Sequence, residues 1–202
     1  MIIRSLCFFL IISTTAAHAQ KWPFELWHDG KIVLQSGDTL KGFVKYDLQQ
    51  DMVQFNIKDK VIETFTARKV LFFEIFDTSV HKYRQFFTIP YNINGGYSAP
   101  IFFELLAVGK ITLLAREALE YKTYNTPYYV GSYSRLVLVN KFFLMDQKEN
   151  ITTFNGTRED LLDLMEPKSE EVRKYMKENH FDITDKYDLA KVVDYYNSLT
   201  GI

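Results

Sequence analysis

The sequence predicts an α+β fold, in which a bent, mainly antiparallel sheet is closed by C-terminal helices. Aromatic residues make up 16% of the 202-residue chain, a composition that favours wide pleated surfaces over helix bundles. The apolar residues alternate with polar ones or form short continuous runs as far as residue 157, and beyond it they follow helical spacing. These two patterns predict a β-rich part, residues 20–157, and a helical part, residues 158–202, packed together in one domain.

The β-rich part carries roughly nine or ten strand patterns. Val53–Ile57 alternates strictly, and Ser36–Thr39 predicts a hairpin turn. The apolar runs Val70–Phe76 and Ile101–Val108 fit central strands buried on both faces. Further strand patterns cover Lys31–Gln35, Leu40–Tyr46, Val61–Thr66, Lys82–Ile89, Lys110–Arg116, Arg135–Met145 and Ile151–Phe154. This number suits a sandwich or a partly open barrel, and the sequence leaves both open.

The helical part contains two or three amphipathic helices. Thr157 precedes Arg158-Glu159-Asp160, which is an N-cap signature, and Pro167 ends that first helix. Ser169 and Thr184 are the expected caps of the next two. The last helix has an apolar stripe at i, i+3, i+4, i+7 spacing: Leu189, Val192, Val193 and Tyr196. We therefore expect this helix to pack against the sheet.

Residues 1–19 read as a secretory signal peptide. Arg4 supplies a positive charge, Leu6–Ile12 is the apolar stretch, and Ala17-His18-Ala19 is a small-x-small cleavage pattern. We expect cleavage after Ala19 and an exported protein, periplasmic or secreted. The apolar run is too short to cross about 30 Å of hydrocarbon, so no transmembrane segment is expected after cleavage. The only cysteine, Cys7, lies in the removed segment, so the mature chain has neither disulfide nor thiol.

The charge balance and the remaining motifs predict no nucleic-acid partner, metal or cofactor. Lys and Arg number 24 against 25 Asp and Glu, so no overall field attracts nucleic acid. The mature histidines, His28, His81 and His180, are far apart and lack metal-site spacing. Gly109-Lys110 lacks the other residues of a phosphate-binding loop and reads as a turn.

A tyrosine-rich segment, residues 121–133, is the candidate binding surface. Its tyrosines are Tyr121, Tyr124, Tyr128, Tyr129 and Tyr133, among residues that favour loops. Tyrosine presents a flat apolar face and a hydrogen-bonding tip, which suits contact with a glycan or a protein. The alternative is a long hairpin loop folded back over the sheet, with rings that only cover core.

The sequence favours a non-enzymatic binding or envelope-structure module, with an unknown protein or glycan of the cell envelope as partner. No recognisable nucleophile, metal cluster or phosphate loop is present. The alternative is a hydrolase that acts on glycans through scattered carboxylates such as Asp38, Glu74 and Glu104. Two carboxylates about 5 to 10 Å apart in a concave pocket would favour the hydrolase.

The order of four phrases resembles a family of uncharacterised exported proteins of Bacteroidota. The phrases are DGKIVLQSGDTLKGFVKYD (Asp29–Asp47), ARKVLFFEIFD (Ala67–Asp77), FFELLAVGKITLLAR (Phe102–Arg116) and DLAKVVDYYN (Asp188–Asn197). They include the family's GDTLxG hairpin and its C-terminal helix ending in Tyr-Asn, and the resemblance covers residues 27–200. One departure is that family members often have Tyr where Leu114 or Ala115 stands. The resemblance implies an envelope or secreted location in a diderm bacterium and brings no catalytic or ligand residue with it.

Overall fold

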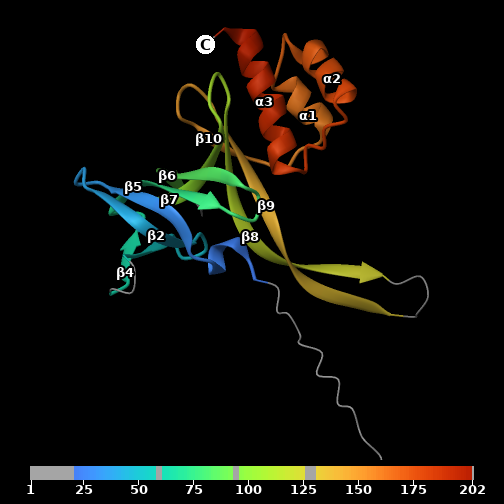
Figure 1. Ribbon diagram of the computed structural model, residues 1–202. Helices are drawn as coiled ribbons and strands as arrows, with labels where there is room; N and C mark the ends of the chain where they lie inside the picture. Colours follow the sequence, from blue (N-terminus) through green and yellow to red (C-terminus); the bar gives the residue numbers. More distant parts are fainter. Residues whose placement is uncertain (1–20, 58–60, 93–95, 126–130, 202) are drawn as a thin grey trace, which may run out of the picture.

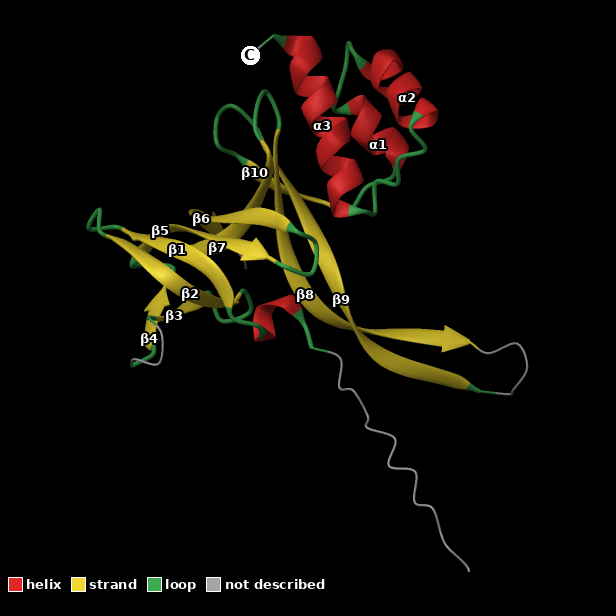
Figure 2. Ribbon diagram, in the orientation of Figure 1, coloured by secondary structure: helices red, strands yellow, loops and turns green. Residues whose placement is uncertain are grey.

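The computed structural model describes residues 21–57, 61–92, 96–125 and 131–201. Within them the chain forms one ten-stranded antiparallel sheet, in the order β10-β9-β8-β7-β6-β5-β1-β2-β3-β4, and three C-terminal α-helices (Figure 1, Figure 2). The strands are β1 (His28–Leu34), β2 (Thr39–Asp47), β3 (Met52–Asn56), β4 (Glu63–Thr66), β5 (Val70–Asp77), β6 (Lys82–Asn92), β7 (Ser98–Ala107), β8 (Thr112–Asn125), β9 (Ser132–Met145) and β10 (Ile151–Phe154). The helices are the 3-10 turn η1 (Pro23–Glu25), α1 (Arg158–Asp163), α2 (Ser169–Glu178) and α3 (Lys186–Thr200). The predicted fold class, a bent sheet closed by C-terminal helices, is confirmed.

The sheet is a single open one, and it bends until the β2–β3 turn meets β7 and β8. Asp51 in that turn accepts a hydrogen bond from the Phe102 backbone N–H at 2.8 Å. Arg116 of β8 donates to Asp51 Oδ1 at 2.8 Å, to the Phe102 carbonyl at 2.5 Å and to the Leu48 carbonyl. β7 pairs with β8 only from Glu104 onward, so Phe102 has no partner on β8. The β2–β3 turn contacts β7 at Phe102 instead. The sequence did not distinguish a sandwich from a partly open barrel. The structure has one curled sheet.

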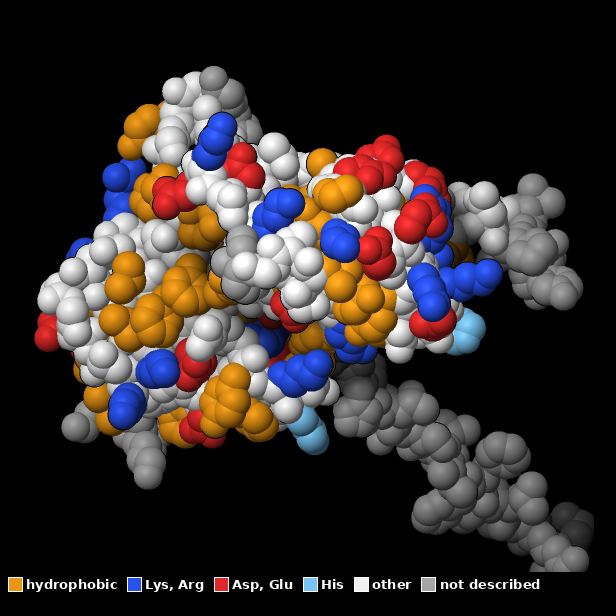
Figure 3. Space-filling view, turned by 90° about the horizontal axis from the view of Figure 1, so that it is seen from above, with side chains coloured by type: hydrophobic (Ala, Val, Ile, Leu, Met, Phe, Trp, Pro, Cys, Tyr) orange, Lys and Arg blue, Asp and Glu red, His pale blue; other side chains and the backbone are white. Residues whose placement is uncertain are grey.

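The two continuous apolar runs differ in burial. For Ile101–Val108 the expectation holds in the first half, since Ile101–Glu104 are all buried, whereas Leu105 and Leu106 are half-buried and Val108, after the end of β7, is 65% exposed. The same expectation is wrong for β5, whose burial alternates and whose Leu71 is 45% exposed. The outer face of β5 is half-exposed, with Phe72 stacked on Phe87 of β6 at 5.2 Å between ring centroids. Figure 3 shows hydrophobic side chains gathered over the strands, and acidic and basic side chains interspersed over the helices.

The start of α1 is the predicted one. Thr157 Oγ1 accepts a hydrogen bond from the Asp160 N–H at 3.3 Å, and the Asp160 carboxylate accepts one from the Thr157 N–H at 2.6 Å. This reciprocal pair is a capping box, which satisfies backbone donors at the helix start. Pro167 lies in the turn between α1 and α2.

The two other predicted caps are wrong. The N-cap of α2 is Lys168, and Ser169 is already inside the helix, where its hydroxyl donates to Glu166 at 2.7 Å. The N-cap of α3 is Asp185, whose carboxylate accepts from two backbone N–H groups of the first turn. Thr184 lies one residue before this cap, where its hydroxyl and its backbone N–H both donate to Asp182.

The helices cover the inner face of the sheet at its β7–β10 side. The predicted stripe of α3 is confirmed, since Leu189, Val192, Val193 and Tyr196 are at most 1% exposed in an apolar cluster that includes residues of β7 to β10, α1 and α2. A second apolar cluster lies under β1 to β7. In the part of the chain that the structure describes, no helix has both the length and the apolar character that crossing a bilayer requires.

Candidate functional site

Strands β8 and β9 form a long two-stranded arm that projects from the body of the protein (Figure 1). Their pairing runs without a break from Thr112 opposite Met145 to Asn125 opposite Ser132. The neighbouring strands cover only the base of this ribbon, because β7 pairs with β8 at Leu113–Ala115 and β10 pairs with β9 at Phe142–Met145. We call residues 116–125 and 132–141 the β8–β9 arm, of which Arg116 and Glu117 form the base and contact the body. In these residues neither edge has a strand beside it.

Three of the five predicted tyrosines lie on the β8–β9 arm. Tyr121 is 77% and Tyr133 is 52% exposed. Tyr124 stacks on Tyr133 with 5.5 Å between ring centroids and 21° between planes, and the Arg135 guanidinium lies 4.9 Å from the Tyr124 ring. The alternative of a loop folded back over the sheet is wrong for the described residues, because they are strand residues and their rings do not cover core. The remaining two tyrosines, Tyr128 and Tyr129, lie outside the described residues.

The two faces of the arm differ in character. Cross-strand partners share a face of a sheet. One face carries the apolar pairs Leu119–Leu138 and Tyr121–Leu136 in the middle of the arm, and the polar pairs Thr123–Ser134 and Asn125–Ser132 nearer its tip. The opposite face carries Tyr124–Tyr133, Lys122–Arg135 and the ion pair of Glu120 with Lys141. One face of the arm is therefore apolar in its middle and polar toward the tip, and the other face is aromatic at the tip with an excess of positive charge.

The carboxylates of the hydrolase alternative do not lie together. Asp38 is in the β1–β2 turn, where it accepts a hydrogen bond from Ser36 at 2.8 Å. Glu74 lies on the outer face of β5 and pairs with Lys31 at 3.0 Å. Glu104 is buried on the inner face of β7. The sheet separates Glu74 from Glu104, because the strand register gives them opposite faces.

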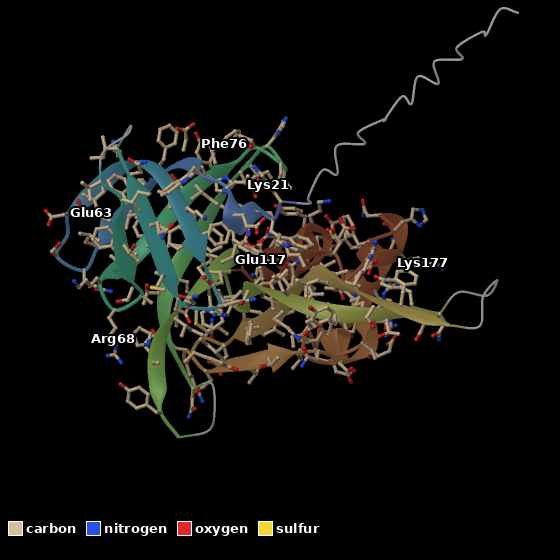
Figure 4. The ribbon with its side chains drawn as sticks, turned by 90° about the horizontal axis from the view of Figure 1, so that it is seen from below. Lys21, Glu63, Arg68, Phe76, Glu117 and Lys177 are labelled. Atoms are coloured by element: carbon tan, nitrogen blue, oxygen red, sulfur yellow. The ribbon has the colours of Figure 1, made fainter. Side chains whose placement is uncertain are left out.

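Glu104 belongs to a buried ionic cluster that is centred on Arg84 of β6. The Arg84 guanidinium donates two hydrogen bonds to Glu104, both at 2.8 Å, one to Asp77 at 2.9 Å and one to Glu117 of β8 at 2.5 Å. Lys186 of α3 adds a second cation, 3.0 Å from Glu104 Oε2. Figure 4 places Glu117 in the middle of the molecule, between the N-terminal strands and the helices.

The ionic cluster contains three carboxylates and two cations, each with an ion-pair partner. Burial acts to raise the pKa of Glu104, but the charge and hydrogen bonds of Arg84, assisted by Lys186, outweigh it and lower that pKa. Burial also raises the pKa of the Tyr46 phenol well above its usual value, and this phenol donates to Glu117 at 2.8 Å. Glu104 and Asp77, whose pKa values are both lowered, are thus held as bound anions, which suits a structural role better than general acid or base chemistry.

The sequence contained one signal for this cluster that pattern reasoning missed. Arg84 and Phe86 have the same parity in β6, so a strand that directs Phe86 into the core also directs Arg84 inward. A charged residue on the core face needs a buried counter-charge. The partners could not be named from spacing because they come from β5, β7, β8 and α3.

The described ranges contain no group of three or more His, Cys, Asp or Glu side chains placed to hold a metal ion. His28 donates from Nε2 to the Pro23 carbonyl at 2.8 Å, and His81 contacts the Thr78 carbonyl through Nδ1 at 2.5 Å. Comparison of the chain with protein-family models, with curated proteins and with solved structures gives no match. The resemblance to exported Bacteroidota proteins therefore stays a prediction.

Proposed function

We propose that the protein is an exported, non-enzymatic binding or envelope-structure module, periplasmic or secreted, that holds a protein partner through the β8–β9 arm. One observation carries the proposal: the arm is a two-stranded ribbon with two free edges and apolar side chains that the body does not cover. A two-stranded hairpin alone is marginally stable in water. Free strand edges also pair readily with another chain. A partner that lies along the arm would remove both weaknesses.

The chemistry of the arm favours a protein over other partners. Addition of a strand to a free edge supplies backbone hydrogen bonds, and the side chains on the two faces then supply specificity. Tyrosine and arginine, which contribute strongly to many protein interfaces, meet on one face in Tyr124, Tyr133 and Arg135. The hydrolase alternative has less support, because its three carboxylates lie apart and Glu104 is bound by Arg84 and Lys186.

Site-specific photocrosslinking in the native envelope tests this proposal. A photoreactive phenylalanine analogue replaces Tyr121 or Tyr133 on the arm, and Tyr83 of β6, which is 71% exposed on the body, serves as the matched control position. We expect one discrete adduct from both arm positions and none from the control. The variant with Tyr121→Ser and Tyr133→Ser should lose the complex at an unchanged melting temperature. Equal adducts from all three positions, or an intact complex in the double variant, would refute the arm as the contact surface.

A further inference from the structure

A hollow of about 350 Å³ with a mixed polar and apolar lining lies between η1 and strands β2, β3 and β4, away from the faces of the arm. Its lining includes the ring of Phe24 and the side chains of Met52, Lys45, Gln50, Gln54 and Thr64. Pockets for small molecules start at about 300 Å³, so the hollow has room for a small ligand but not for a long polymer segment.

The strand register explains why polar side chains meet in this hollow. Lys45 of β2 is opposite Gln54 of β3, and Gln54 is in turn opposite Thr64 of β4. The three side chains therefore form a row across three neighbouring strands on one face of the sheet. Met52 lies two residues from Gln54 on that same face. The row, Met52 and Phe24 of η1 all line the hollow.

The polar groups of this row make no polar contact with the described part of the protein. Among the described residues, the side chains of Lys45, Gln54 and Thr64 have neither a hydrogen bond nor an ion pair, and the same holds for the Gln50 amide. The two carboxylates of the lining differ in this respect. Glu25 accepts the Trp22 N–H at 2.8 Å, and Asp47 accepts two backbone N–H groups of the β2–β3 turn. An amine, two amides and a hydroxyl are thus free to bind a ligand.

We infer that this hollow is a binding site for a neutral sugar of one or two rings. Each glutamine amide both donates and accepts, as sugar hydroxyls do. Phe24 and Met52 offer the apolar surface against which the C–H face of a sugar ring packs. The lining holds one cation, Lys45, and two carboxylates, Glu25 and Asp47, so a phosphate or another anion would be repelled. An apolar ligand would leave the amides and the amine desolvated without partners.

The site does not include the β8–β9 arm, so sugar binding at the hollow is tested independently of the proposed function. Titration of the ¹⁵N-labelled mature protein with glucose, galactose, mannose and N-acetylglucosamine, followed by backbone amide chemical shifts, tests it. We expect at least one of these sugars to give saturable shifts confined to residues 24–25, 45–54 and 64, with a dissociation constant of about 1 mM. Inorganic phosphate should leave these signals unchanged.

Two variants and one control complete the test. Gln54→Leu removes an amide from the centre of the row, and Thr64→Val removes a hydroxyl without changing the shape of the side chain. Gln54→Leu should weaken sugar binding about tenfold, because the lost hydrogen bonds are not replaced. Gln147→Leu, in the exposed β9–β10 turn, should bind as the unaltered protein does. The amide spectrum of each variant verifies its fold.

Three results would overturn the inference. The first is that none of the four sugars gives saturable shifts at the lining residues. The second is that Gln54→Leu, with an intact spectrum, binds as tightly as the Gln147→Leu control. The third is that phosphate shifts the same signals, which would show an anion site instead.

Discussion

The ammonium of Lys186, the first residue of α3, lies 3.0 Å from Glu104 Oε2 in the middle of β7. Both side chains are buried, at 8% and 2% exposure. The pair attaches the helical part to the sheet at the same point where Arg84 binds Glu104 from β6. The ionic cluster therefore lies between the two apolar clusters of the inner face and joins the start of α3 to β7 and β8.

Arg84→Met should destabilise the protein by about 3–5 kcal/mol, because it leaves three buried carboxylates facing a single cation. Urea unfolding of the variant measures this loss. The control is Arg173→Met, which removes an exposed arginine paired with Glu159 and should change stability little. Equal stability of both variants would mean that the ionic cluster is not a determinant of the fold.

The folded state should lose stability when the pH falls below about 4, the ordinary pKa of a carboxyl group. Glu104 and Asp77 have lowered pKa values in the folded protein, in each case because Arg84 and neighbouring hydrogen bonds outweigh the opposing effect of burial. The folded state then binds fewer protons than the unfolded state, so this stabilisation is complete above pH 4 and is lost as the pH falls through the lowered values.

The variant Glu104→Gln tests that pH dependence. It should be less stable at neutral pH and should show a shallower fall in the free energy of unfolding as the solution is acidified. Glu170→Gln, on the exposed side of α2, should retain the full slope. An unchanged slope in Glu104→Gln would assign the acid sensitivity to other groups.

Gly109 and Asn197 should show strong coupling in a double-mutant cycle. Asn197 accepts the Ile111 N–H at 3.0 Å and donates to the Ile111 carbonyl at 2.8 Å, so Asn197→Ala should cost about 1–3 kcal/mol. A Cβ on Gly109 would lie 2.4 Å from Asn197 Cγ, so Gly109→Ala should displace the asparagine and lose the same bonds. The double variant should therefore cost less than the sum of the two single ones, as calorimetry can measure. Simple additivity would contradict the contact.

Leu189→Ala in α3 should destabilise the protein by about 2–5 kcal/mol, since Leu189 is fully buried against the sheet. Removal of residues 185–202 eliminates the whole stripe and Lys186, and we expect that chain to unfold or aggregate. Circular dichroism and gel filtration report both outcomes. A soluble truncated chain with the full melting temperature would show that α3 is not needed for the sheet.

Export should remove residues 1–19, and the mature protein should begin at Gln20. N-terminal sequencing of the exported protein tests this prediction, and a chain that still begins at Met1 would contradict it. Because the mature chain has no cysteine, its melting temperature should be the same with and without a reductant.

Local patterns in the sequence determined most of the secondary structure. Alternation predicted β3, the capping box predicted the start of α1, and the spacing of Leu189, Val192 and Val193 predicted the buried face of α3. Each of these signals depends on residues a few positions apart, whose relation is fixed by the repeat of a strand or a helix. The caps predicted at Ser169 and Thr184 were wrong by one residue each, because the N-caps of these helices are Lys168 and Asp185 and a local pattern does not fix a helix start to the single residue.

The tertiary structure alone decided the arm, the ionic cluster and the hollow beside η1. Residues 121–125 and 132–133 of the tyrosine-rich segment are strand residues because β8 and β9 keep pairing after β7 and β10 have ended, which no local pattern records. Arg84 meets Glu104, and Gln54 meets Lys45 and Thr64, only through the register of strands that are distant in sequence. Register is set by packing of the whole sheet, and a shift of one residue would send each of these side chains to the opposite face.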